Sequence, residues 1–226
     1  EDVIETSKSV IPEFNVSLHT FAQRDKPQFY DIYVGMDLGL NDYTHVIFGY
    51  YDFDVAKIII EHEYVCNSKT TKEIVENIVR VETEKYPGRK PLLRISDNEA
   101  QQLYDFNVTY GLHVSPAKKY DKDELINRTR RMFQDGKILI SQECIGLIHQ
   151  LKVGIWNNRR TDYERLPGAG HLDGIDALRY LIRSIDYNKN PVPAYSGMSS
   201  HTHPIAPQRQ QGHELNKLVN WYGKHK

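Results

Sequence analysis

Residues 32–66 read IYVGMDLGLNDYTHVIFGYYDFDVAKIIIEHEYVC. Three runs in this stretch, 32–38, 44–51 and 57–66, are rich in β-branched and aromatic residues, which favour strands. Short turn sequences, 39–42 and 52–54, separate them. Because short connections join antiparallel neighbours, we expect these three strands to form an antiparallel meander.

The rest of the chain alternates helical and strand patterns. Apolar spacing predicts helices over 71–86, 98–110, 121–134, 144–151 and 171–186, and strands over 91–97, 112–115 and 137–140. Thr70 and Glu73 have the spacing of a capping box at the first helix. We also expect a hairpin within 152–163 and a short helix over 214–222. This order predicts an α/β fold with a mixed β-sheet, antiparallel in its first three strands and then parallel, flanked by helices on both faces.

Three regions differ in their patterning. Residues 1–28 are polar and irregular, so we interpret them as a linker or N-terminal arm. The periodic region, 29–188, predicts one folded domain, and 189–226, with several prolines, predicts a flexible C-terminal tail. The chain begins with Glu1 rather than Met, as expected of a piece of a larger protein.

Composition excludes several classes of protein. The 226 residues are 39% hydrophobic, enough for a sizeable core, and no apolar run approaches the roughly 18–20 residues that span a bilayer. We therefore expect no membrane partner. The two cysteines, Cys66 and Cys144, lie far apart, which favours reduced thiols over a disulfide or zinc site. The net charge of −1 does not mark the whole surface as a nucleic-acid binder, so local patches matter more.

Four aspartates lie at the ends of predicted elements. Asp37 lies late in the first strand, where a carboxylate is costly to bury unless it is paired or binds a cation. Asp97 ends the strand predicted over 91–97, and ligands of α/β sheets bind at such strand ends. Asp173 and Asp176 share one face of the last helix, outside its apolar stripe.

Such a set suits phosphodiester hydrolysis. Two Mg²⁺ or Mn²⁺ ions about 3.5–4 Å apart activate a water and neutralise the phosphate, and they prefer hard oxygen ligands. Without cations, four clustered carboxylates would repel one another and raise one another's pKa. The sequence therefore predicts a two-metal site built from these aspartates.

Three segments resemble the acidic motifs of the nuclease domain of tailed-phage large terminase subunits. They are residues 35–39 (GMDLG), 95–97 (ISD) and 171–180 (HLDGIDALRY), and the last is the most specific. The resemblance covers roughly residues 30–187. It implies an RNase H-like fold and an endonuclease that cuts double-stranded viral concatemer DNA during genome packaging.

The resemblance also implies roles for individual residues. Asp37 would bridge both metals, Asp97 would bind one, and Asp173 would supply a third ligand, with Asp176 binding metal directly or through a ligand. His171 is a further candidate ligand or proton shuttle, and Glu99 a candidate partner of the metal ligands.

The resemblance implies partners as well. The sequence has no G-x-x-x-x-G-K-[ST] motif, so the family's ATPase motor domain would belong to the full-length protein, together with contacts to small terminase and portal. The expected location is the cytoplasm of the infected host cell.

Basic residues in two segments are candidates for contact with the DNA backbone. Residues 118–131 carry a local charge of +3, from six basic and three acidic side chains, and 159–160 lie at the expected hairpin. The candidates are Lys118, Lys119, Lys122, Arg128, Arg131, Arg159 and Arg160.

Two other functions fit the same residues. One is a Holliday-junction resolvase or transposase core, which shares the first two acidic motifs. The other is a non-catalytic packaging-motor module that grips DNA or docks on a portal. The presence of all four aspartates argues against the non-catalytic module.

Overall fold

The computed structural model describes residues 8–39, 43–97, 99–117, 122–165 and 171–193. The chain divides into two units, Glu1–Pro191 and Val192–Lys226. All the helices and strands given below belong to the first unit.

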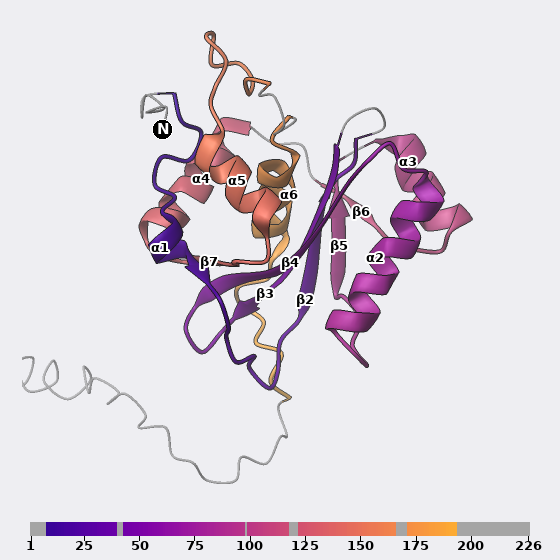
Figure 1. The fold of residues 1–226 in the computed structure, drawn as a ribbon. Coiled ribbons are helices and arrows are strands. Elements are labelled where there is room, and N and C mark those ends of the chain that lie inside the picture. Colours follow the sequence, from indigo (N-terminus) through magenta and orange to yellow (C-terminus); the bar gives the residue numbers. More distant parts are fainter. Residues whose placement is uncertain (1–7, 40–42, 98, 118–121, 166–170, 194–226) are drawn as a thin grey trace, which may run out of the picture. The chain divides into compact units, whose positions relative to one another are not determined.

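Within the described residues, seven strands form one sheet in the order β1-β7-β4-β3-β2-β5-β6 (Figure 1). β2, β3 and β4 pair antiparallel, whereas β5 pairs parallel with β2 and β6, and β7 pairs parallel with β4 and β1. The predicted meander and mixed sheet are therefore confirmed. The strands are β1 (Thr20–Phe21), β2 (Ile32–Asp37), β3 (Tyr43–Asp52), β4 (Lys57–Asn67), β5 (Leu93–Ser96), β6 (Ser115–Pro116) and β7 (Ile138–Ser141).

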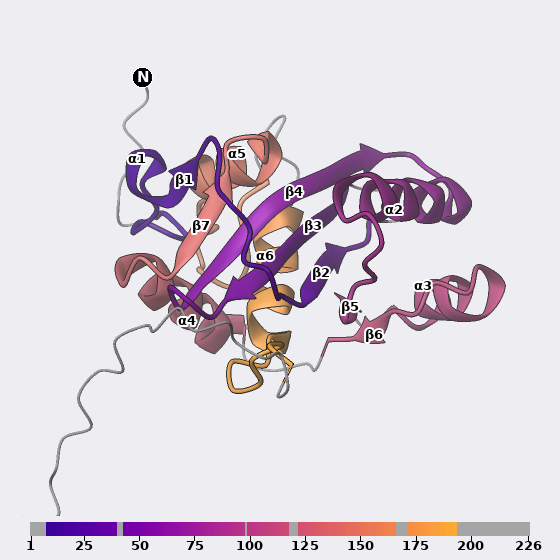
Figure 2. The ribbon, with the colours of Figure 1, turned by 90° about the horizontal axis from the view of Figure 1, so that it is seen from below.

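Helices cover both faces of this sheet, as Figures 1 and 2 show. On one face lie α2 (Thr71–Lys85), α3 (Ala100–Tyr104) and the π-helix η1 (Asp105–Thr109). On the other lie α4 (Lys122–Gln134), α5 (Ile145–Val153) and α6 (Asp173–Ser184). The short helix α1 (Val16–His19) leads into the edge strand β1. Each face of the sheet thus has its own hydrophobic core.

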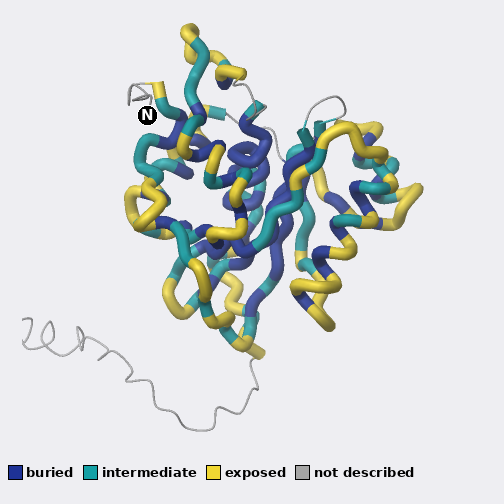
Figure 3. Tube along the Cα trace, in the orientation of Figure 1, coloured by how far each residue is buried: buried dark blue, intermediate teal, exposed yellow. Residues whose placement is uncertain are grey.

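Side-chain alternation along β2 assigns residues to these two cores. Val34 and Met36 pack with the α2 residues Ile74 and Ile78, whereas Tyr33 packs on the face that carries α6. The centre of the sheet is almost wholly buried (Figure 3). Positions of odd number in β2 therefore face α6.

Two predicted elements differ from the structure at the far edge of the sheet. The helix expected over 98–110 is split into α3 and η1, and the strand expected over 112–115 is replaced by β6 at Ser115–Pro116. The Asn107 side chain bonds to both the amide and the carbonyl of Val114. These hydrogen bonds satisfy the backbone at Val114 in place of a neighbouring strand, so pairing starts later.

The N-terminal segment contributes to the fold. Val10 and Ile11 are buried in the α6-side core, and β1 pairs with β7. Ser9 also bridges to Ile155. Helical or strand periodicity could not reveal these contacts, because the elements involved are only two to four residues long.

The expected hairpin is present in shortened form. Trp156 and Tyr163 form an antiparallel bridge, and the Asn157 side chain accepts from the amides of Arg159 and Thr161 in the turn. The helix before it extends to Val153, two residues further than expected. The helix expected over 214–222 lies outside the described residues.

The structure also describes the two cysteines and the lengths of the helices. Cys66 and Cys144 are free thiols. In the part of the chain that the structure describes, no helix is both long and apolar enough to cross a membrane.

Candidate metal centre

Two of the four aspartates lie at the same edge of the sheet. Asp37 is the last residue of β2, and Asp97 directly follows β5. These strands run parallel, and Met36 is paired with Ser96. The register therefore brings the backbone of Asp37 beside that of Asp97, as the sequence predicts.

The face that Asp37 presents follows from the alternation in β2. Gly35 is two residues earlier and shares its face. A Cβ at position 35 would lie 2.3 Å from the carbonyl oxygen of Ala177, in α6. Only glycine allows this approach, so Gly35 lets α6 lie directly against the strand that ends in Asp37.

The first turn of α6 carries the other two aspartates. Asp173 opens the helix and Asp176 follows one turn later, and both are buried. The preceding residue, Leu172, has a left-handed backbone with φ of 59°. The Gly174 amide donates to Oε1 of Gln150 at 2.7 Å, which ties this turn to α5.

The charges of the other three aspartates act on Asp37. Burial, followed by the negative charges of Asp176, Asp173 and Asp97, raises the pKa of the Asp37 carboxyl well above its ordinary value. The positive charge of Arg179 opposes this rise. The structure thus brings together all four carboxylates that the sequence singled out, with one buried arginine beside them.

Asp176 is held by hydrogen bonds from two side chains. Its Oδ1 accepts from the Tyr163 hydroxyl at 2.7 Å and from Nε and Nη2 of Arg179 at 3.0 and 2.5 Å. Burial, and next the charge of Asp176, raise the pKa of the Tyr163 hydroxyl, so it remains a donor. A cation near Asp176 would therefore have to be met by the other oxygen, Oδ2.

The set of donors suits a hard divalent cation. Carboxylate oxygens are the ligands that Mg²⁺ and Mn²⁺ prefer, and a cation would relieve the repulsion that the pKa of Asp37 records. Among the described residues, however, no three His, Cys, Asp or Glu side chains already stand at metal-binding spacing. The carboxylates therefore lie near Asp37 without forming a closed set of metal ligands among these residues.

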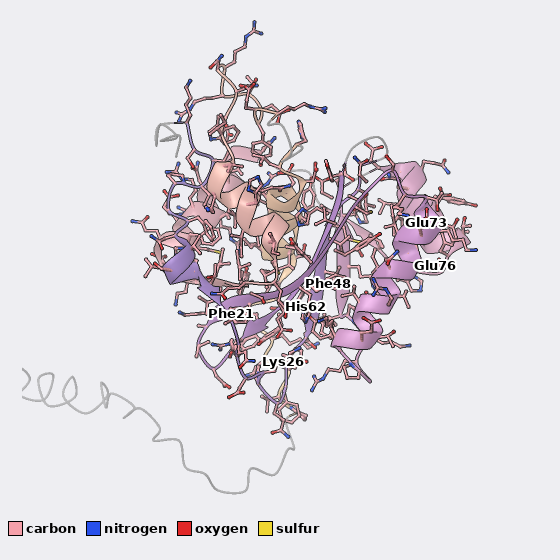
Figure 4. All side chains as sticks on the ribbon, in the orientation of Figure 1. Phe21, Lys26, Phe48, His62, Glu73 and Glu76 are labelled. Carbon is pink, nitrogen blue, oxygen red and sulfur yellow. The ribbon has the colours of Figure 1, made fainter. Side chains whose placement is uncertain are left out.

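Glu73, Glu76, Glu99 and His171 have other surroundings. Glu73 and Glu76 project from α2, on the face of the sheet opposite to α6 (Figure 4). Glu99 is the exposed residue that precedes α3. His171 has its Nε2 3.6 Å from Oδ2 of Asp162, and its ring lies against Tyr163. His171 thus borders the hairpin next to the cluster.

The lysines and arginines that are candidates for DNA binding differ in their surroundings. Lys118 and Lys119 lie outside the described residues. Lys122 donates to Oδ1 of Asp162 at 2.6 Å and lies 3.7 Å from the centre of the Tyr163 ring, so its charge is already engaged. Arg131 and Arg159 are exposed.

Arg128 lines a cleft beside β5, with a volume of about 610 Å³. Two residues of β5, Leu93 and Ile95, line the cleft, and Ile95 lies two residues before Asp97. Arg160 lies in the hairpin turn with a positive φ of 54°. The cleft is lined by Leu93, Ile95, Ser115, Pro116, Glu124, Leu125, Arg128, Arg183 and Ser184.

Two polar residues near the cluster were not singled out from the sequence. His45 in β3 is the register partner of Asp37, and its Nε2 is 2.9 Å from Oε2 of Glu63 in β4. His45 interrupts a strand that is otherwise mainly apolar, which is the same signal that marked Asp37. Glu63 lies in the polar run 61–63 of β4 and carries no such signal. The acidic motifs drew attention to the carboxylates alone.

Comparison with known proteins finds similarity to phage large terminases. No family model matches the chain. It is 28% identical over 166 residues to the large terminase subunit of Escherichia phage T5, a match over 71% of this chain and 36% of that protein. The chain therefore spans well under half the length of this relative.

Solved structures agree on the fold. A large terminase from a thermophilic bacteriophage superposes with a TM-score of 0.67 at 19% identity, over 79% of this chain and 46% of that one. The large terminase nuclease domain of bacteriophage SPP1, solved with bound Mn, gives a TM-score of 0.54 at 18% identity, over 73% and 94%. The expected RNase H-like fold and the resemblance to large terminases are confirmed.

Proposed function

We propose that this chain is the nuclease domain of a phage large terminase, a divalent-metal-dependent endonuclease that cuts double-stranded DNA during genome packaging. The observation that carries the proposal is the meeting of Asp37 and Asp97 with the acidic first turn of α6. The sequence match to the T5 protein supports the packaging role.

We assign the residues as follows. Asp37 lies among the other three carboxylates and would bridge two cations, with Asp97 and Asp173 each holding one. Asp176, whose Oδ1 is held by Tyr163 and Arg179, would contribute Oδ2 or orient its neighbours. Bound Mg²⁺ or Mn²⁺ would supply Lewis acidity toward the phosphodiester.

Basic side chains outside the carboxylate cluster would bind the duplex. Exposed Arg131 and Arg159, and Arg128 in the cleft along β5, are suited to contact phosphates without reading base sequence. The T5 large terminase subunit and the large terminase of the thermophilic bacteriophage are longer than this chain. We propose that an ATPase motor domain completes the protein in the infected cell's cytoplasm. Small terminase and portal would be its further partners.

Cleavage of supercoiled plasmid in Mn²⁺ tests the proposal. Asp37→Ala should abolish cutting while the circular dichroism spectrum stays that of the wild type. Glu76→Ala, which removes an acidic side chain from the opposite face of the sheet, should cut normally. Retained cutting by Asp37→Ala would refute the assignment.

The same assay separates the two alternatives. Faster cutting of a four-way junction than of linear duplex would indicate a resolvase. Binding of duplex by the wild-type protein without any metal-stimulated cutting would indicate a module that only grips DNA.

A further inference from the structure

Three polar side chains form a row across β2, β3 and β4. The row begins at Asp37, a member of the carboxylate cluster. Asp37 pairs with His45 in the register of β2 and β3. In the register of β3 and β4, Ile47 pairs with Glu63, so Glu63 is diagonal to His45 on the same face. The row therefore runs from the end of β2 to the start of α5.

Glu63 is anchored at the start of α5. Its carboxylate accepts from the amides of Gly146 at 2.6 Å and Leu147 at 2.9 Å, and from Nε2 of His45 at 2.9 Å. Burial alone would raise the pKa of the Glu63 carboxyl, but these hydrogen bonds lower it below its ordinary value. The ionised Glu63 thus holds the His45 ring in one orientation.

The other side of the His45 ring packs against Gly174 in α6. His45 is fully buried, and a Cβ at Gly174 would come within 2.6 Å of its Cε1 and 2.7 Å of its Nδ1. Nδ1 has no hydrogen-bond partner among the described residues. The ring therefore acts on α6 by packing against the backbone of the residue that follows Asp173.

Two side chains thus contact the first turn of α6 and support it. The His45 ring packs against Gly174 from the sheet, and Gln150 accepts the Gly174 amide from α5. Glu63 joins these supports, because it contacts both the His45 ring and the N-terminus of α5. Movement of any one of them would shift Asp173 relative to Asp37.

We propose that His45, held by Glu63, is a positioning residue of the metal centre, which sets the place of Asp173 opposite Asp37. This inference rests on the proposed metal-dependent nuclease. Four mutually repelling carboxylates need rigid support to meet a cation, and side chains behind the ligands supply it in other metal sites.

Titration of the metal-free protein with Mn²⁺, without DNA, tests this inference. His45→Leu keeps an apolar side chain in the core but cannot donate to Glu63, and its Mn²⁺ affinity should fall by about 10-fold or more. His45→Gln can place a donor near the position of Nε2, so it should recover most of that affinity.

Hydrogen exchange gives a second measurement that does not depend on metal. The Gly174 amide, which donates to Gln150, should exchange faster in metal-free His45→Leu than in the wild type. Ile78→Ala is the matched control, because Ile78 is fully buried in the core on the opposite face. It should lower stability while leaving the Mn²⁺ affinity unchanged, and any faster exchange should be spread over the core rather than concentrated at Gly174.

The outcomes are distinct. Wild-type Mn²⁺ affinity in His45→Leu, or an equal loss of affinity in Ile78→Ala, would overturn the positioning role. If the wild-type protein itself bound no Mn²⁺, the proposed nuclease would fail, and the inference with it. Weak binding in His45→Leu together with recovery in His45→Gln supports it.

Discussion

Gly35 of β2 and Ala177 of α6 are in direct backbone contact: a Cβ on Gly35 would lie 2.3 Å from the Ala177 carbonyl oxygen and 2.9 Å from Cβ of Leu181. This contact brings the helix that carries Asp173 and Asp176 against the strand that ends in Asp37. The absence of a side chain at one position thus determines whether the four aspartates can meet.

Gly35→Ala should therefore impair both the fold and the site. The obstructing atom belongs to the backbone, so α6 must move away, and we expect a loss of about 1–3 kcal/mol in the free energy of unfolding. Urea denaturation measures this loss, and Mn²⁺ titration measures the accompanying fall in affinity. An unchanged urea midpoint would show that α6 does not depend on this contact.

Asp37→Asn should make the metal-free protein more stable. The substitution removes an ionisable carboxyl at a buried position, where burial and the charges of the other three aspartates disfavour ionisation. Thermal unfolding in EDTA at neutral pH should show a higher midpoint than for the wild type. Added Mn²⁺ should stabilise the wild type and have little effect on the variant. A lower midpoint in EDTA would contradict this account of the cluster.

Tyr163→Phe should destabilise the protein through Asp176. The buried hydroxyl donates to Oδ1 of Asp176, and loss of a hydrogen bond to a charged group costs about 1.5–3 kcal/mol. Tyr104→Phe, at an exposed position on α3, is the control and should unfold at the wild-type urea concentration. Equal midpoints for both variants would show that the Tyr163 hydroxyl contributes nothing.

Glu63→Gln should lower stability in a pH-dependent way. The folded-state pKa of Glu63 is lowered, so its ionised form stabilises the fold above the unfolded pKa of about 4.3. This contribution is lost as the pH falls through the lower folded-state pKa. The difference in unfolding free energy between wild type and Glu63→Gln should thus be largest near neutral pH and shrink below about pH 4. A difference that stays constant with pH would contradict the assigned ionisation.

Much of the fold could be predicted from local patterns. The strands of the meander, the capping box at Thr70 and Glu73 and the apolar stripe of α6 each depend on residues close together in sequence. The burial of Val10 and Ile11 could not be predicted in this way, because short irregular segments gain their order from contacts with distant elements. The late start of β6 likewise depends on the Asn107 side chain.

The sequence by itself determined which residues could carry the chemistry, because carboxylates at strand ends and at one helix face are visible as a pattern. Only the tertiary structure decided which side chains surround the four aspartates. Asp176 is bound by Tyr163 and Arg179, and His45 and Glu63 lie behind Asp37 and Asp173. The Asp176–Arg179 pair lies within one turn of α6. The other contacts join elements that are far apart in sequence, and a local pattern of side chains carries no information about them.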